Sequence, residues 1–232
     1  MVFIKKYLIL SILLTLFCGL GWAQIRDLPI LSSEFWFFAE NSPVFGNIER
    51  NRATQEEEAT NRIKDLLDEA VFVYSGMIYG FSFSYTPSDL RRGVGEEFSI
   101  VPTSTIRFGD PAMRVRGTRR DDTRTFVRLE YRCEERHLAW LNFWNSSAFP
   151  VIGGSGTSFA NIGAESRIEA IEQAVKESVR SYMRRRVHNK PRTITGSFVF
   201  AEPPVIRYAA GLYTASVRIK VDIVDVEAYR FF

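Results

Sequence analysis

The spacing of apolar residues switches twice along this chain from a helical period to a strand period, and this constrains the fold more than any other feature. Between residues 54 and 74 apolar side chains recur at three- and four-residue steps, which predicts an amphipathic helix. From Met77 to Tyr85 they alternate with small residues, which predicts a half-buried strand. A second helix between Ile168 and Tyr182 is followed by strands over 194–200 and 215–224. We therefore expect an α+β fold with two long amphipathic helices packed on a mostly antiparallel sheet.

The repeated helix-strand-strand order also fits two related α-β-β halves, covering residues 50–110 and 138–224. Gly80 precedes Pro87 by seven residues, and Gly196 precedes Pro203 by the same spacing. The distance from helix to strand differs between the two halves, so an internal duplication stays open beside a single α+β domain over residues 24–232.

Between these segments the sequence predicts further strands and a loop. A short strand is expected over 97–101, and two alternating segments around residues 119–122 predict a two-stranded meander. Residues 138–149 are apolar at both odd and even positions, which predicts a central strand covered on both faces. Residues 153–157 predict a glycine-rich turn before the second helix. An anion or glycan contact at that helix start is the alternative.

Residues 1–23 follow the three-part order of a secretory signal peptide. Two lysines precede an apolar run from Tyr7 to Leu20, and small residues stand just before Gln24. The run has about fourteen residues, whereas a membrane-spanning helix needs about twenty. We therefore expect cleavage before Gln24 and export. A retained anchor and a lipoprotein attached through Cys18 are the alternatives.

Composition argues against nucleic-acid binding and against a disulfide framework. The formal charge of the chain is +3, and loss of the two signal-peptide lysines leaves +1, far from the basic excess of a nucleic-acid-binding domain. Cys133 is the sole cysteine of residues 24–232, so no internal disulfide can form there. Stability must therefore come from packing.

Cys133 and His137 are the residues that could pair as a thiol nucleophile and its base. Their spacing is unspecific, and Cys133 shares its strand parity with Leu129 and Tyr131, which predicts a buried cysteine. We expect no catalytic residue, no metal site and no cofactor.

A cationic cluster follows the second helix and is the strongest local indication of binding. Its side chains could meet a partner's acidic face or the anionic headgroups of a membrane, although complementation of the helix dipole explains them equally well. The partner or anion contacts that this predicts are Arg184, Arg185, Arg186, Lys190 and Arg192, with His188 among them.

Two further stretches, Val151–Gly156 and Ala164–Val175, resemble a small bacterial envelope domain. It is the domain of the LPP20-like lipoproteins and of the N-terminal part of the flagellar-assembly protein FlgT, in which a strand and a small-residue turn lead into an alanine-spaced helix. The resemblance covers about residues 138–224. It implies a non-enzymatic assembly role near the outer membrane or the flagellum, and it carries over no catalytic residue. This chain departs from the pattern in having fewer alanines in the helix and no usable lipid-attachment cysteine.

These features together predict an exported bacterial envelope protein of the periplasm or the inner face of the outer membrane, with a non-enzymatic binding, scaffolding or assembly role. Expected partners are envelope or flagellar-assembly proteins, with peripheral membrane contact an option. The aromatic segment Phe35–Phe38 is a second candidate contact. The alternative is a periplasmic module for a small ligand or glycan, in which Trp140 and Trp144 stack on sugar rings.

Overall fold

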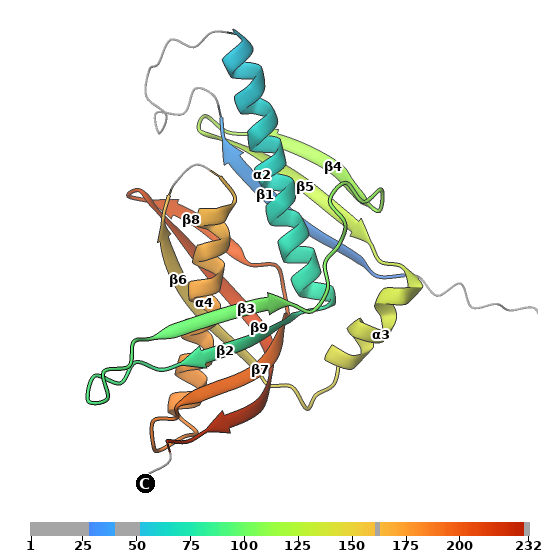
Figure 1. Cartoon of the computed structure of the whole chain (residues 1–232). Helices are drawn as coiled ribbons and strands as arrows, with labels where there is room; N and C mark the ends of the chain where they lie inside the picture. The colour runs from blue at the N-terminus through green and yellow to red at the C-terminus, as the bar shows by residue number, and fades with distance from the viewer. Residues whose placement is uncertain (1–27, 40–51, 161–162, 230–232) are drawn as a thin grey trace, which may run out of the picture.

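The computed structural model describes residues 28–39, 52–160 and 163–229 (Figure 1). The helices of these ranges are α2 (Arg52–Ile78), α3 (Glu135–Trp144) and α4 (Glu165–Arg184). The strands are β1 (Ile30–Phe38), β2 (Phe81–Thr86), β3 (Glu97–Pro102), β4 (Met113–Arg120), β5 (Arg124–Arg132), β6 (Val151–Phe159), β7 (Thr193–Phe200), β8 (Val205–Ala209) and β9 (Leu212–Glu227). The expected signal peptide lies outside the described residues. Among the residues described, no helix is long and apolar enough to cross a membrane.

The strands form two separate antiparallel sheets (Figure 1). The smaller sheet has the order β1-β5-β4, with Ile30 paired to Arg132 at one end and Phe38 to Arg124 at the other. The larger sheet has the order β3-β2-β7-β9-β6, and β8 also pairs with β9. The expected strand over 97–101 and the meander around residues 119–122 are confirmed as β3 and as the β4–β5 hairpin.

The predicted fold class is wrong in its arrangement. Both segments predicted to be long helices are helical, as α2 and α4. Strands outnumber helices among the described elements, however, and the strands form two sheets instead of one. A third helix, α3, follows β5 and precedes β6 in the sequence. The strands that follow the two long apolar stripes, β2 and β3 in one case and β7 and β9 in the other, lie in the same larger sheet.

The glycine-rich stretch is a strand and not the expected turn. Strand β6 pairs along its whole length with β9, from Val151 opposite Lys220 to Phe159 opposite Leu212. Helix α4 lies directly against the glycine face of β6. A Cβ atom added to Gly156 would stand 2.2 Å from the Ala174 nitrogen, and one added to Gly154 would stand 2.5 Å from Ser178 Oγ. These glycines therefore allow close helix packing on the strand.

The segment expected to be a central strand, residues 138–149, is instead mostly helix α3. Its first turn is stabilised by His137, whose Nδ1 accepts a hydrogen bond from the Glu134 N–H at 2.9 Å. Trp144 and His137 are buried, while Trp140 and Phe143 are partly exposed. A buried strand has apolar residues at odd and even positions, but so does a helix that packs against more than one neighbour. The distribution of apolar residues therefore could not distinguish a strand from a helix here.

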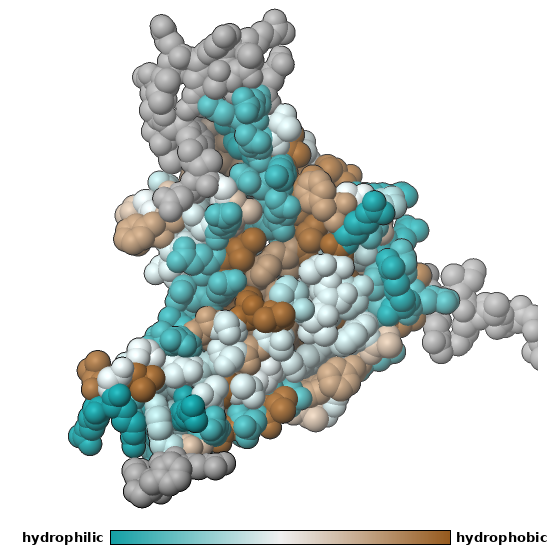
Figure 2. Space-filling view, viewed as in Figure 1, coloured by the Kyte–Doolittle hydropathy of each residue, from teal (hydrophilic) through white to brown (hydrophobic). Residues whose placement is uncertain are grey.

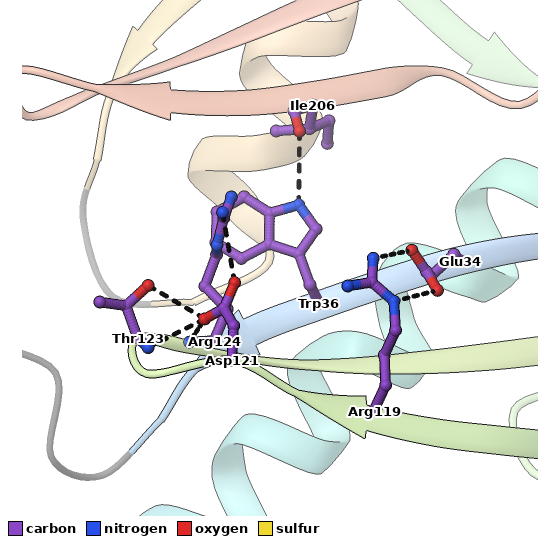
Figure 3. A network of polar contacts seen from close by, with 7 residues as sticks. All are labelled: Glu34, Trp36, Arg119, Asp121, Thr123, Arg124 and Ile206. Atoms are coloured by element: carbon purple, nitrogen blue, oxygen red, sulfur yellow. Dashed lines mark hydrogen bonds and ion pairs between the residues drawn. The ribbon is translucent and has the colours of Figure 1, made fainter.

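Helix α2 joins the two sheets through aromatic packing. Tyr74 is fully buried, donates a hydrogen bond to the Leu129 carbonyl at 2.7 Å and stacks on Tyr131 of β5. On the other side of the smaller sheet, Trp36 Nε1 donates to the Ile206 carbonyl of β8 at 3.3 Å (Figure 3). Arg124 covers the Trp36 ring at 5.4 Å and is paired with Asp121. The smaller sheet is thus packed against α2 on one face and against the β8–β9 region on the other.

Candidate functional site

A basic cleft of about 720 Å³ lies between the C-terminal end of α4 and the connection from β2 to β3. Two segments about ninety residues apart in sequence form its walls. Its cationic residues are Arg91, Arg92, Arg180, Arg184 and Lys190, and its carboxylates are Asp89 and Glu96. Cations therefore exceed carboxylates by three.

The wall from the β2–β3 connection is a tight turn. Asp89 and Val94 exchange backbone hydrogen bonds of 2.8 and 3.0 Å, and Gly93 takes a φ of +67° that few other residues tolerate. The Asp89 carboxylate accepts hydrogen bonds from the Arg91 N–H at 3.1 Å and from Arg92 Nη1 at 2.5 Å. The hydrogen bond from Arg92 lowers the pKa of Asp89. The turn therefore presents its arginines from a fixed backbone.

The opposite wall comes from the last turn of α4 and the connection to β7. Met183 is buried and anchors this turn in the core, while Arg184 on the next position is exposed. Lys190 donates a hydrogen bond to the Ser88 carbonyl and so joins this connection to the β2–β3 connection. Pro191 is buried below it. The two walls are held together by direct contact.

The floor of the cleft holds a charged network around Glu96. Tyr85 donates a hydrogen bond to Glu96 Oε1 at 2.8 Å, and Lys176 and Arg180 lie 3.3 and 3.9 Å from this carboxylate. Burial raises the pKa of Glu96, but the Tyr85 hydrogen bond and the two cations outweigh it and lower the pKa overall. Glu96 is therefore ionised at neutral pH, and together with Glu177, whose Oε2 lies 3.4 Å from Arg180 Nη1, it holds Arg180 at the floor.

Both carboxylates of the cleft are already engaged, whereas Arg91 and Arg184 make no ion pair within the described part of the chain. The C-terminal dipole of α4 complements Arg184, but a helix end supplies only about half a negative charge. The cleft thus keeps unbalanced positive charge in a concave surface, where guanidinium groups can bind carboxylate or phosphate oxygens through paired hydrogen bonds.

The cationic cluster predicted from sequence is divided by the fold. Arg184 and Lys190 line the cleft, as does His188. Arg185 is exposed at the end of α4, Arg186 lies over the Tyr182 ring at 4.4 Å, and Arg192 pairs with Glu227 at 3.1 Å.

Sequence reasoning missed the arginines at 91 and 92, because nothing in the sequence placed the β2–β3 turn beside α4. The dipeptide Arg91-Arg92 next to a glycine was the one signal that could have drawn attention to this turn.

The Cys133–His137 pair has the features of a core and not of a reaction centre. Both side chains are fully buried. Burial raises the pKa of the Cys133 thiol to about 11, and burial likewise lowers the pKa of His137. A neutral thiol without access to solvent is a poor nucleophile. No group of three or more metal-ligating side chains occurs in the ranges that the structure covers.

The aromatic candidates are mainly structural. In the segment Phe35–Phe38, three of the four side chains are buried, and Phe37 is half-buried. Trp144 is 5% exposed, while Trp140 is 37% exposed and packs edge-on against Tyr79. No pair of exposed tryptophan faces is therefore available to stack on a sugar at this place in the described structure.

Comparisons with known proteins give a relative and a family. An uncharacterized protein of Treponema pallidum (strain Nichols) is 24% identical over 204 residues, which cover 87% of this chain and 83% of that protein. No solved structure matches the chain. A protein-family model matches residues 19–229, and the chain therefore belongs to that family.

Proposed function

We propose that this protein is a non-enzymatic binding protein of the bacterial cell envelope and that its basic cleft binds an anionic group of another envelope component. The observation that carries the proposal is the charge of the cleft. Arg91 and Arg184 face it from opposite walls without an ion pair in the described chain, and both carboxylates are already engaged. A free anion would complete this arrangement.

The size of the cleft supports a small ligand or headgroup. A volume of about 720 Å³ lies within the range of about 300 to 1,000 Å³ that is typical of small-molecule sites. A single phosphate would fill a small part of it, so an organic phosphate or carboxylate fits better than a bare ion. Tyr85, Met183 and Val187 add apolar surface beside the cations.

The envelope setting in this proposal rests on the sequence. Residues 1–23 have basic, then apolar, then small residues, and this order supports export. The resemblance of residues 138–224 to the LPP20-like and FlgT domain supports an assembly role. An assembly role and an anion site are compatible, because the bound anion can belong to the component on which the protein assembles.

An NMR titration of the purified protein with glycerol phosphate tests the proposal. We expect the amide resonances of residues 89–92 and 184–190 to shift together. Arg184→Ser should weaken binding about tenfold, because one charge-assisted hydrogen-bonding group is lost. Arg114→Ser, which removes an exposed arginine of β4, is the matched control and should leave binding unchanged. Shifts that are scattered over the surface, or an affinity in Arg184→Ser equal to that of the wild type, would rule out the cleft.

A further inference from the structure

We infer that the anionic component is a phospholipid membrane, and that the protein docks on it with the β2–β3 turn and the end of α4, inserting Leu90. This inference rests on the proposed function, since the same cleft would receive the lipid headgroup. It adds the class of partner and the orientation of the protein on it.

Leu90 is the most exposed large apolar residue that the structure describes, at 91%. It stands at the apex of the β2–β3 turn, directly before Arg91 and Arg92. Figure 2 shows hydrophobic and hydrophilic atoms side by side at the free end of this hairpin. A single exposed leucine is ordinary on a protein surface. A leucine beside two arginines on the rim of a cationic cleft is the combination that interfacial membrane binding uses.

The turn is rigid enough to present this leucine at little entropic cost. Besides the paired backbone bonds of Asp89 and Val94, the Arg92 N–H donates to the Asp89 carbonyl at 3.0 Å. The Arg92 guanidinium also lies over the Tyr229 ring at 4.2 Å. The apex is therefore supported by its own backbone and by Tyr229, which follows β9.

The basic residues around the apex lie at the same end of the molecule. The β2–β3 turn and the connection after α4 both stand at the lower end in Figure 1, and Lys190 bonds the second to the first through Ser88. Arg184, Arg185, Arg186 and His188 are exposed there. A planar anionic surface can meet all of these side chains together with the apex.

The balance of apolar and charged surface favours a membrane over a folded acidic protein. A stable protein interface buries about 800 Å² on each partner and has an apolar centre. Among the described residues that line the cleft, Leu90 is the one strongly exposed large apolar side chain, and it stands among five cations. A bilayer with anionic lipids accepts that combination, since the leucine enters the acyl boundary while the cations meet phosphates. Arg91 and Arg184 then bind the phosphate of one lipid in the cleft.

Cosedimentation with vesicles tests the inference. We expect binding to vesicles that contain phosphatidylglycerol, a loss of at least tenfold with phosphatidylcholine alone, and weakening as salt rises. Leu90 also lines the cleft, but its side chain offers no hydrogen bond to a phosphate. Leu90→Ser should therefore lower vesicle affinity about tenfold and glycerol phosphate affinity by less than about twofold, while Arg184→Ser should lower both about tenfold. Val115→Ser is the matched control, because Val115 is 61% exposed on β4, a strand of the smaller sheet that contributes no residue to the cleft, and its loss should change neither.

The outcomes separate the two claims. Glycerol phosphate binding without vesicle binding would overturn the membrane inference and leave the proposed function standing. Vesicle binding that Leu90→Ser does not weaken would also overturn it. Crosslinking of the cleft to an acidic protein, with no vesicle binding, would assign the surface to a protein partner instead. Binding of neither probe would overturn both claims.

Discussion

Arg167 and Glu69 form a buried ion pair that joins α4 to α2, with 3.0 Å between Arg167 Nε and Glu69 Oε2. Arg167 also donates a hydrogen bond to the Trp36 carbonyl of β1, and its guanidinium lies over the Trp36 ring at 4.4 Å. One arginine thus connects both of these helices with the smaller sheet. Both charged side chains are less than 10% exposed. This contact adds to the Tyr74 and Trp36 contacts that hold the smaller sheet in place.

Removing one partner of this pair should destabilise the fold strongly. Glu69→Ala leaves the guanidinium of Arg167 buried without its carboxylate, and the expected loss is about 3 to 5 kcal/mol in the free energy of unfolding. Glu202→Ala is the control, because it breaks the exposed pair with Arg218 and should cost less than about 1 kcal/mol. Urea unfolding measures both. Equal losses in the two variants would show that the buried pair has no special weight.

Close packing of α4 on β6 predicts a second stability effect. In Gly156→Ala the new methyl group would collide with the α4 backbone. We therefore expect the free energy of unfolding to decrease by about 1 to 3 kcal/mol. The control is Gly117→Ala on β4, where an added Cβ has nothing within 4 Å. Thermal unfolding of both variants gives the comparison. A neutral Gly156→Ala would contradict the close approach of helix and strand.

The protein should become less stable as the pH is lowered, because His137 titrates in the unfolded chain at a higher pH than in the folded protein. Its Nδ1 accepts a hydrogen bond, its Nε2 finds no partner in the described structure, and burial lowers its pKa below 6.5. The unfolded chain therefore takes up a proton near pH 6.5 that the folded protein does not. The free energy of unfolding should decrease from pH 7 downward until the folded pKa is reached, by at most about 1.4 kcal/mol per pH unit.

The variant His137→Gln should show a shallower decrease over this range than the wild type. His188→Gln, in the exposed connection after α4, should keep the wild-type slope. Denaturant unfolding between pH 7 and pH 5 measures the three proteins. A wild-type slope in His137→Gln would mean that other groups cause the pH dependence.

Cys133 should react slowly with thiol reagents in the folded protein. Its side chain is fully buried, and its pKa of about 11 leaves almost no thiolate at neutral pH. We expect labelling by iodoacetamide to follow global unfolding, with an increase of at least a hundredfold in urea. Mass spectrometry of the peptide that contains Cys133 gives the rate. Fast labelling of the native protein would reopen a role for this thiol in catalysis.

The sequence predicted local structure correctly where the spacing of apolar residues fits either a helix or a strand but not both. The alternation at 127–133 and the Arg119–Asp122 turn correspond to β5 and its hairpin with β4. It failed where one pattern serves two structures. Gly153 to Gly156 fits a turn or a strand under a helix, because glycine provides both conformational freedom and space. The choice depends on α4, whose position is tertiary information.

For the same reason, only one wall of the basic cleft could be predicted from the sequence. Arg184 and Lys190 are close in sequence and were recognised as a cationic cluster. Arg91 reaches the same cleft from the β2–β3 turn only because β2 pairs with β7, which starts just after that cluster. Long-range strand pairing of this kind leaves no local signal. The buried role of Arg167 was missed likewise, since an arginine on an amphipathic helix is usually solvated.

Site-specific photo-crosslinking in the native cells tests the central claim, anion binding in the basic cleft, most directly. A photo-reactive amino acid would replace His188 on the cleft and, as a control, Arg114 on β4. We predict that position 188 captures a phosphate-bearing envelope molecule, identified by mass spectrometry as an anionic phospholipid, and that position 114 does not. Capture at position 114 with none at position 188 would contradict the account.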